Sequence, residues 1–312
     1  MSSHPIISII APIYNEAGSI PELYRRVSDV MQSAGESWEF ILVDDGSQDA
    51  SIEMIRDLAA KDAHVRPVIF ARNFGHQIAV TAGLDYSRGQ AIVIIDSDLQ
   101  DPPEVILELI AKWREGYEVV YAVRQEREGE SFFKLITAKL FYRIINRVTS
   151  IDIPLDTGDF RLMDRNVVNV LNTMREHHRF LRGMSAWVGF RQVGVPYKRA
   201  ARYAGETHYP LRNMVRLAFT AISGFSFFPL QLATFLGFFS AGISVLSIPI
   251  VIVLRLAGVQ AFLGQATTLI AVLFFGGVQL ISLGVLGEYI GRLYDEARGR
   301  PLYIVREGPD SE

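Results

Sequence analysis

Cysteine is absent from this chain of 312 residues. Disulfide bonds and thiolate metal ligands are therefore excluded. The net charge at pH 7 is only −3, which argues against a nucleic-acid partner, because nucleic-acid-binding domains carry a strongly basic surface. Mean hydropathy is +0.20, which is high for a soluble enzyme in which 21% of the residues are charged.

Charge is also missing from two long segments near the C-terminal end. No charged residue occurs from Leu217 to Leu254 or from Leu256 to Gly287. A helix needs about 20 apolar residues to cross a bilayer, so we expect transmembrane helices near Leu230–Leu254 and Thr268–Tyr289 joined as a hairpin. A pair of buried core helices is the alternative, although soluble helices of this length carry charges on an exposed face.

Basic residues flank the predicted hairpin at both of its ends. They are Arg191, Lys198, Arg199, Arg202, Arg212 and Arg216 before it, and Arg292, Arg298 and Arg300 after it. The positive-inside rule then places both termini and the N-terminal domain in the cytoplasm, on a multi-pass protein of the cytoplasmic (inner) membrane. Met1–Ile10 has no basic region and no long apolar stretch, so we expect no cleavable signal peptide.

The first 200 residues alternate short apolar runs with stretches of helical spacing. The predicted strands are Ile6–Ile13, Trp38–Val43, Val65–Phe70, Ala91–Ile95 and Glu118–Ala122, and the predicted helices are Gly18–Met31, Ala50–Ala60 and Glu104–Trp113. This alternation predicts an α/β fold with a mostly parallel sheet. Ligands of such sheets bind beyond the carboxyl ends of the strands.

Polar segments follow four of the predicted strands. They are Pro12-Ile13-Tyr14-Asn15-Glu16, Asp44-Asp45-Gly46-Ser47, Arg72-Asn73-Phe74-Gly75 and Asp96-Ser97-Asp98. Each of them alone is compatible with an ordinary turn or helix cap. Four of them at one edge of a sheet favour a binding site.

Asp96 and Asp98 predict a divalent metal site at this edge. Alternating carboxylates at a strand end can reach one hard cation, and Gln100 can add an amide oxygen. Mg²⁺ and Mn²⁺ prefer oxygen ligands and are commonly held by one or two carboxylates together with substrate phosphates. The chain has neither a Gly-x-x-x-x-Gly-Lys-Ser/Thr loop nor a Gly-x-Gly-x-x-Gly turn after a strand, which argues against a P-loop enzyme and a dinucleotide cofactor.

Four motifs together resemble family 2 glycosyltransferases of the nucleotide-sugar-binding GT-A fold. The motifs are "APIYNEAGSI", "VDDGSQD", "DSDLQDPPE" and "DTGDFRLMD". The likeness is to polyprenyl-phosphate glycosyltransferases, similar to bactoprenol glucosyltransferases and dolichyl-phosphate mannose synthase, and it covers nearly the whole chain. It implies a catalytic domain over residues 1–210, a hairpin over 229–291 and a cytoplasmic tail over 292–312.

The resemblance also implies roles for individual residues. The nucleotide-binding positions correspond to Pro12, Tyr14, Glu16, Asp45, Arg72 and Gly75, and Asp45 is expected to accept a hydrogen bond from a uracil or guanine N–H. The metal and diphosphate site corresponds to Asp96, Asp98 and Gln100, and the proposed catalytic base corresponds to Asp159. The basic positions near the acceptor phosphate or diphosphate correspond to Arg124, Lys134, Arg202 and His208. His208 stands where the family usually has lysine, so its charge near pH 7 depends on its surroundings.

Two amphipathic stretches support a membrane-borne acceptor independently of the family. Phe132–Val148 carries apolar residues largely on one side with basic residues between them, and Leu211–Phe225 has a similar character. Basic amphipathic helices often lie in the membrane interface, so we expect interfacial helices over about 131–149 and 211–228. Ordinary core packing is the alternative.

The sequence therefore predicts inverting transfer of one sugar from a nucleotide diphosphate sugar to polyprenyl (undecaprenyl) phosphate, with Mg²⁺ or Mn²⁺ as cofactor. UDP-glucose is the favoured sugar donor; UDP-GlcNAc, UDP-galactose, GDP-mannose and an amino-arabinose donor are alternatives. A processive synthase would carry a Gln-x-x-Arg-Trp motif, which is absent, and a nucleotidyltransferase would not need the hairpin. A non-catalytic membrane scaffold is the alternative from another class. Whether the chain forms a homo-oligomer is left open.

Overall fold

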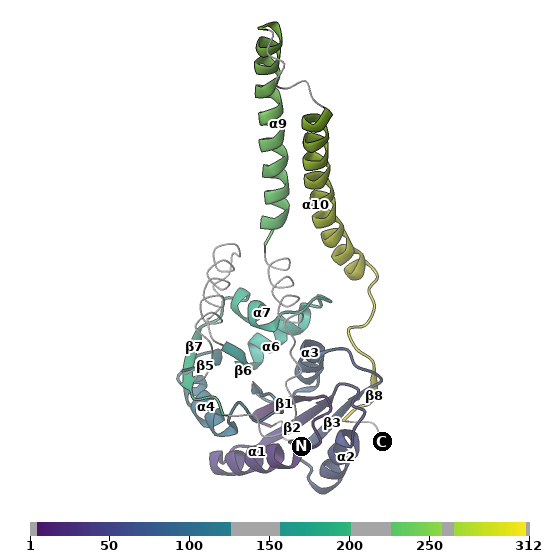
Figure 1. Cartoon of the computed structure of the whole chain (residues 1–312). Coiled ribbons are helices and arrows are strands. Elements are labelled where there is room, and N and C mark those ends of the chain that lie inside the picture. The colour runs from purple at the N-terminus through teal and green to yellow at the C-terminus, as the bar shows by residue number, and fades with distance from the viewer. Residues whose placement is uncertain (1–4, 126–156, 201–225, 258–264, 310–312) are drawn as a thin grey trace. The chain divides into compact units, whose positions relative to one another are not determined.

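The computed structural model describes residues 5–125, 157–200, 226–257 and 265–309 (Figure 1). The chain divides into two compact units, Met1–Ala221 with Pro301–Glu312 and Ile222–Arg300. The predicted interfacial helices lie outside the described residues, except for positions 226–228 at the end of the second one.

The first unit is an α/β domain. Its elements are β1 (Ile7–Ile13), α1 (Ile20–Ala34), β2 (Trp38–Asp44), α2 (Ser51–Lys61), β3 (Val65–Phe70), α3 (His76–Tyr86), β4 (Ala91–Ile94), the short helix η1 (Pro103–Val105), α4 (Ile106–Arg114), β5 (Val119–Arg124), β6 (Thr157–Asp164), α6 (Arg165–Thr173), α7 (Leu181–Trp187), β7 (Gln192–Tyr197) and β8 (Val305–Glu307). The five predicted strands and three predicted helices are all confirmed, with ends that differ by a few residues. Helix α3 was not predicted.

Within the described residues the strands form one sheet in the order β7-β5-β6-β4-β1-β2-β3-β8. The four adjacent strands β4, β1, β2 and β3 run parallel to one another, and β5 runs parallel to β7. Strand β6 is antiparallel to both β4 and β5, and β8 is antiparallel to β3. The predicted mostly parallel sheet is therefore confirmed, with an antiparallel strand inserted beside β4.

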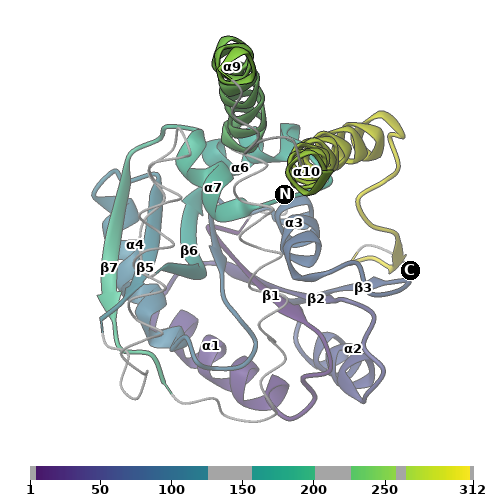
Figure 2. The same ribbon diagram turned by 45° about the horizontal axis from the view of Figure 1, so that its top comes forward.

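Helices cover both faces of this sheet, which explains why the central strands are apolar throughout. Figure 2 shows α1 and α2 on one side and α3, α6 and α7 on the other. All seven residues of β1 are buried, as expected for a parallel strand covered on both faces. The main core joins β1 and β2 to buried residues of α1, α2 and α4, among them Leu23, Ile55 and Leu109.

The second unit consists of two long helices, α9 (Phe228–Leu256) and α10 (Gln265–Ala297). Segments Phe228–Ile250 and Ala271–Ala297 are long and apolar enough to cross a membrane, with mean hydropathies of 1.8 and 1.7, and they are not buried. The hydroxyl of Tyr289 donates a hydrogen bond of 2.8 Å to the carbonyl of Ser226, which joins α10 to the residues just before α9. The prediction of two long apolar helices is confirmed; that they cross a membrane stays a prediction.

Candidate active site

The carboxyl ends of β1, β2 and β4 meet at one edge of the sheet. Ile13, the last residue of β1, pairs with Asp44, the last residue of β2. On the other side of β1, Ile10 pairs with Ile94, the last residue of β4. The chain segments that leave these strands are therefore close to one another.

Hydrogen bonds tie the segments after β1 and β2 together. The amide of Asn15 donates to Ser47 Oγ at 3.0 Å, and the amide of Glu16 donates to Ser51 Oγ at 3.1 Å. Tyr14 follows directly after β1, before these two contacts, and is 40% exposed. Pro12 is the sixth residue of β1. The three predicted nucleotide-binding residues of this segment thus lie on or directly after β1.

Asp45 holds the loop that follows β3, which comprises Arg72–Gly75 and is called loop 72–75 below. Its carboxylate accepts hydrogen bonds from the amides of Phe74, at 2.6 Å, and Gly75, at 2.9 Å. Burial raises the pKa of Asp45 to about 6, although these amides favour its ionised form. Gly46 has φ +72°, and a Cβ there would lie 2.5 Å from the backbone carbon of Arg72, so only glycine allows the two loops to approach this closely.

The two predicted metal-ligating aspartates have few protein contacts. Asp96 Oδ1 is buried and has no hydrogen-bond partner among the described residues; His76 Nε2 lies 3.7 Å from it. Burial raises the pKa of Asp96 to about 6, even though the His76 charge opposes the shift. Asp98 Oδ1 accepts a hydrogen bond of 3.1 Å from the amide of Gln100, across Leu99 with its φ of +59°.

These residues fit a divalent cation that the substrate helps to bind. In the described part of the chain, no group of three or more acidic or histidine side chains could hold a metal by itself. A buried carboxylate oxygen without a partner is costly unless a cation or donor compensates it. Two carboxylates completed by phosphate oxygens are a common arrangement for Mg²⁺ and Mn²⁺.

The third aspartate of this segment, Asp101, is compensated by the protein at one of its oxygens. The hydroxyl of Tyr197 donates a hydrogen bond to its Oδ1, and Arg199 Nε lies 3.9 Å from the same oxygen. Burial raises the pKa of Asp101, while Tyr197 and the charges of Arg124 and Arg199 oppose the shift. Its Oδ1 is therefore held by the protein, whereas its Oδ2 is buried and, like Asp96 Oδ1, has no hydrogen-bond partner among the described residues.

Asp159 lies on β6 and has three hydrogen-bond donors. His76 Nε2 and Gln77 Nε2 donate to Oδ2 at 3.0 and 2.9 Å, and Arg182 Nε donates to Oδ1 at 2.8 Å. Burial alone would raise the pKa of Asp159, but the Arg182 charge and the His76 contact hold it well below its usual range. Asp159 is therefore ionised at neutral pH.

His76 connects the two acidic groups. Its Nε2 is within 3.0 Å of Asp159 and 3.7 Å of Asp96. Burial would lower the pKa of His76, but the bond to Asp159 and the charge of Asp96 raise it to about 9. A protonated His76 thus places one positive charge between the two carboxylates, and its side chain is still 42% exposed.

Sequence reasoning missed His76, Gln77 and Arg182. The first two directly follow the predicted residue Gly75 and begin α3, so their position beside a predicted loop was the available signal. Arg182 is the second residue of α7, and no local pattern indicates that this helix packs against β6. Only the tertiary fold brings it to Asp159.

Arg124 is the one predicted acceptor-site residue that the structure describes; Lys134, Arg202 and His208 lie outside the described residues. It ends β5, and its Nε donates a hydrogen bond of 3.2 Å to the hydroxyl of Tyr197. A Cβ on Gly158 would lie 2.8 Å from Arg124 Nη2, so glycine permits a close approach of Arg124 beside Asp159. Arg72 lies over the Phe74 ring at 4.0 Å.

A GT-A-like sheet with paired aspartates beyond β4 is the architecture of a glycosyltransferase. The family model described as Glycosyl transferase family 2 matches residues 8–171, and the chain belongs to this family. It is 52% identical over 98% of its length to the uncharacterized glycosyltransferase YkcC of Bacillus subtilis, of which 95% is covered. It is 41% identical over 96% of its length to the SfII prophage-derived bactoprenol glucosyl transferase of Shigella flexneri, with 97% of that protein covered.

Among solved structures, glucosyl-3-phosphoglycerate synthase from Mycobacterium tuberculosis in complex with UDP has a TM-score of 0.46 at 22% identity. The match covers 70% of this chain and 78% of that one. A likeness this distant supports no inference about ligands.

Proposed function

We propose that the enzyme transfers one glucose residue from UDP-glucose to a polyprenyl phosphate, such as undecaprenyl phosphate, at the cytoplasmic face of a membrane. The observation that carries the proposal is the identity of 40–41% with bactoprenol glucosyl transferases over 96% of the chain. A match of that extent includes the two apolar helices as well as the α/β domain. The product is a polyprenyl-phospho-glucose.

The reaction is a displacement at the anomeric carbon. An oxygen of the acceptor phosphate forms a bond to C1, while the bond from C1 to the UDP oxygen breaks and the electron pair leaves with the diphosphate. Attack from the opposite face inverts the configuration. A phosphate monoester has its second pKa near 6, so the nucleophile is mostly a dianion at neutral pH without help from a base.

Asp159 is better suited to positioning than to proton transfer. Its low pKa makes it a weak proton acceptor. Its carboxylate fixes His76, Gln77 and Arg182 around the site. We therefore assign it the role of an orienting anion, which holds two cationic side chains where phosphate groups are to be bound.

The nucleotide is assigned to the segments after β1, β2 and β3. Asp45 is ionised at neutral pH, given its pKa of about 6, and an ionised carboxylate can accept a hydrogen bond from a base N–H. Arg72 and Gly75 lie on the loop that Asp45 holds, and the remaining nucleotide contacts are assigned to Pro12, Tyr14 and Glu16.

A divalent cation, Mg²⁺ or Mn²⁺, is assigned to Asp96 and Asp98 with the amide oxygen of Gln100. The orphan oxygen of Asp96 supports this assignment. When bound, such a cation neutralises negative charge on the leaving diphosphate. Arg124, Lys134, Arg202 and His208 are assigned to the acceptor phosphate, which they would hold in line with C1.

A panel of sugar donors tests the proposal. Purified full-length protein is incubated with a short polyprenyl phosphate, Mg²⁺ or Mn²⁺, and each of UDP-glucose, UDP-GlcNAc, UDP-galactose, GDP-mannose and an amino-arabinose donor. We expect the product mass of a polyprenyl-phospho-hexose with UDP-glucose, and a β-linked product by NMR from its α-linked donor. Transfer from another nucleotide sugar alone would replace the assigned donor, and an α-linked product would refute inversion.

Membrane orientation can be tested because the chain has no cysteine. Single cysteines are introduced as Ala261→Cys, between the two apolar helices, and Ser311→Cys, near the C-terminal end. In intact cells a membrane-impermeant maleimide should label the first and not the second. The reverse pattern would place the catalytic domain outside the cytoplasm.

A further inference from the structure

The chain returns to the catalytic unit after the second apolar helix. Strand β8 pairs with β3, with Glu307 opposite Ile69 and Val305 opposite Phe70. The amide of Ala71, the residue before loop 72–75, donates a hydrogen bond of 3.0 Å to the carbonyl of Ile304. The segment Pro301–Glu307, called the tail segment below, therefore extends the edge of the sheet where loop 72–75 begins.

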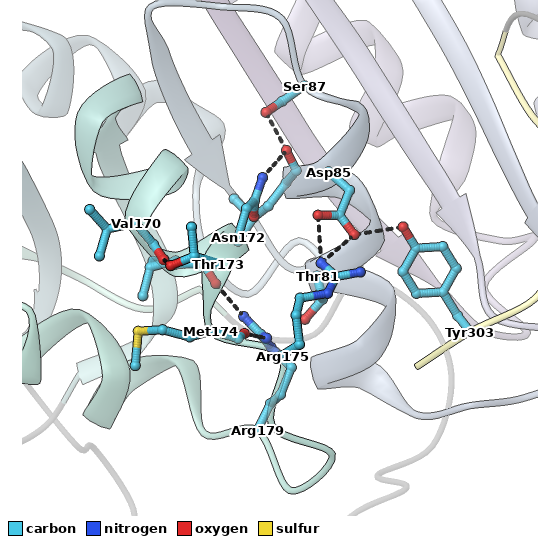
Figure 3. Close-up of polar contacts among 12 residues, drawn as sticks. Thr81, Asp85, Ser87, Val170, Asn172, Thr173, Met174, Arg175, Arg179 and Tyr303 are labelled. Carbon is cyan, nitrogen blue, oxygen red and sulfur yellow. Dashed lines mark hydrogen bonds and ion pairs between the residues drawn. The ribbon is translucent and has the colours of Figure 1, made fainter. Parts of the chain in front are cut away.

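Tyr303 of the tail segment contacts the elements on both sides of loop 72–75. Its ring stacks on Phe70, the last residue of β3, with centroids 5.2 Å apart and planes inclined by 14°. Its hydroxyl donates a hydrogen bond of 2.6 Å to Asp85 Oδ2 in the last turn of α3 (Figure 3). One side chain thus joins the strand that enters the loop to the helix that leaves it.

Asp85 is itself fixed by the segment after α6. Arg175 Nη1 lies 2.8 and 2.9 Å from its two carboxylate oxygens. Arg179 donates to the carbonyls of Met174 and Leu171 at the end of α6 (Figure 3). Arg175 and Tyr303 thus share this carboxylate, which links the tail segment to the segment after α6 through Asp85 of α3.

Aromatic contacts continue from Tyr303 into the loop. Phe70 meets Phe74 edge-on with centroids 5.6 Å apart, and the Arg72 guanidinium lies 4.0 Å from the centre of the Phe74 ring. The amide of Phe74 is bound by Asp45. A continuous line of contacts therefore runs from the tail segment to two residues assigned to the nucleotide.

We propose that Tyr303 is a positioning residue for the nucleotide, which acts by holding loop 72–75 through Phe70, Phe74 and Asp85. The identity of the ligand in this inference rests on the proposed function. The ordering of the loop by Tyr303 does not depend on it. This role of Tyr303 makes the tail segment part of the nucleotide site, although Tyr303 lies more than 200 residues from that loop in the sequence.

The test uses the full chain in detergent with Tyr303→Leu, Tyr303→Phe and the neighbouring control Ile304→Ala, whose side chain is 53% exposed. UDP affinity is measured by calorimetry with Mn²⁺, together with kcat and both KM values. An aromatic pair and a hydrogen bond each contribute about 1 kcal/mol, and each 1.4 kcal/mol is tenfold in affinity. We therefore expect Tyr303→Leu, which loses both contacts, to weaken UDP binding by up to about thirtyfold, and Tyr303→Phe by up to about fivefold. The KM for UDP-glucose should rise equally, while kcat and the KM for polyprenyl phosphate stay unchanged. The control should match wild type.

A second measurement keeps the inference separate from the proposed function. Hydrogen exchange without nucleotide should be faster over residues 71–77 in both Tyr303 variants and unchanged over β1 and β4. If wild type binds neither UDP nor GDP, the proposed function fails and exchange alone decides the inference. Unchanged exchange and affinity in Tyr303→Leu would overturn it, as would a loss confined to kcat. If Tyr303→Leu does not fold, Tyr303→Phe decides by the same two measurements.

Discussion

Asp96 and Asp159 both lie near His76 Nε2, at 3.7 and 3.0 Å, and the protein surrounds them differently. Asp159 receives hydrogen bonds from His76, Gln77 and Arg182. Asp96 Oδ1 receives none among the described residues. The pKa of Asp159 is held well below its usual range by Arg182 and His76 against the effect of burial, whereas burial raises the pKa of Asp96 to about 6.

This difference separates a carboxylate that the protein has compensated with three hydrogen bonds from one that, among the described residues, has only the more distant charge of His76, at 3.7 Å; the two are called compensated and uncompensated below. A buried charge is tolerated when partners compensate it, and otherwise its ionised form is disfavoured. The compensated aspartate is therefore suited to organise its neighbours. The uncompensated one is suited to bind a positive ligand that arrives with the substrate.

The largest expected effect tests the metal assignment beside Asp96. Asp98→Asn removes a ligand charge without changing volume, so we expect transfer to fall to background while the fold is kept. Wild-type transfer should disappear with EDTA and return with Mg²⁺ or Mn²⁺, measured as polyprenyl-phospho-sugar formed. Asp29→Asn, on the exposed face of α1, is the matched control and should retain full activity. Full activity of the EDTA-treated enzyme would end the metal assignment.

The second effect tests the compensated side by its pH dependence. Asp159→Asn should lower transfer about 10²-fold, the scale on which small displacements of positioned groups act. Because the pKa of Asp159 lies well below its usual range, the group stays ionised from pH 5.5 to 8.5. The variant also loses a contact that raises the pKa of His76, so the deficit should stay constant or grow with pH over that range and should not shrink.

A base gives a different profile. The deficit would then shrink above about pH 6, where the acceptor phosphate ionises unaided. Rates of both enzymes at saturating sugar donor and metal distinguish the two roles. Near-normal activity of the variant throughout would remove Asp159 from the mechanism.

The third effect is on stability and should have opposite signs at the two aspartates. Asp159→Asn removes the carboxylate that accepts hydrogen bonds from His76, Gln77 and Arg182, and breaking a buried ion pair typically costs about 3–5 kcal/mol. The pKa of Asp159 lies well below its usual range, so this carboxylate itself stays ionised from pH 5.5 to 8.5. Asp159 also helps to raise the pKa of His76 to about 9, and the stability from a raised histidine pKa fades between about pH 6.5 and 9, so the loss should be larger at pH 5.5 than at pH 8.5. Asp96→Asn removes an uncompensated charge, so metal-free protein should melt a few degrees higher at pH 7.5. Thermal denaturation in EDTA measures both, and a lower Tm for Asp96→Asn would contradict the comparison.

The sequence was sufficient for the uncompensated aspartate and insufficient for the compensated one. Asp96 and Asp98 follow a strand whose apolar run is plain, so local pattern alone predicts their place. The partners of Asp159 come from α3 and α7. Helix α3 was missed because buried residues are consecutive from Ala79 to Leu84, which leaves no amphipathic spacing to detect. The three residues of β8 are likewise too short for a pattern, and their pairing with β3 depends on tertiary contacts.

The smallest expected effect concerns Gly158, which adjoins Asp159 and faces Arg124. A Cβ there would lie 2.8 Å from Arg124 Nη2 and 3.8 Å from Asp101 Oδ2. The obstructing atom is the end of a flexible side chain, so Gly158→Ala should displace Arg124 without unfolding the domain.

If Arg124 helps to bind the acceptor phosphate, the KM for polyprenyl phosphate should rise about threefold, since a shifted charged contact loses part of the roughly 1.5–3 kcal/mol that such bonds contribute. The KM for UDP-glucose and the pH profile should stay as in wild type, because Asp159 keeps its three hydrogen-bond donors. Gly46→Ala is the informative contrast, because there the Cβ would meet backbone atoms of Arg72 at 2.5 Å and the KM for the nucleotide sugar should rise. The opposite result would be a changed KM for UDP-glucose with an unchanged KM for polyprenyl phosphate in Gly158→Ala. In that case Arg124 would be assigned to the sugar donor and not to the acceptor, and the region around Asp159 would bind the diphosphate.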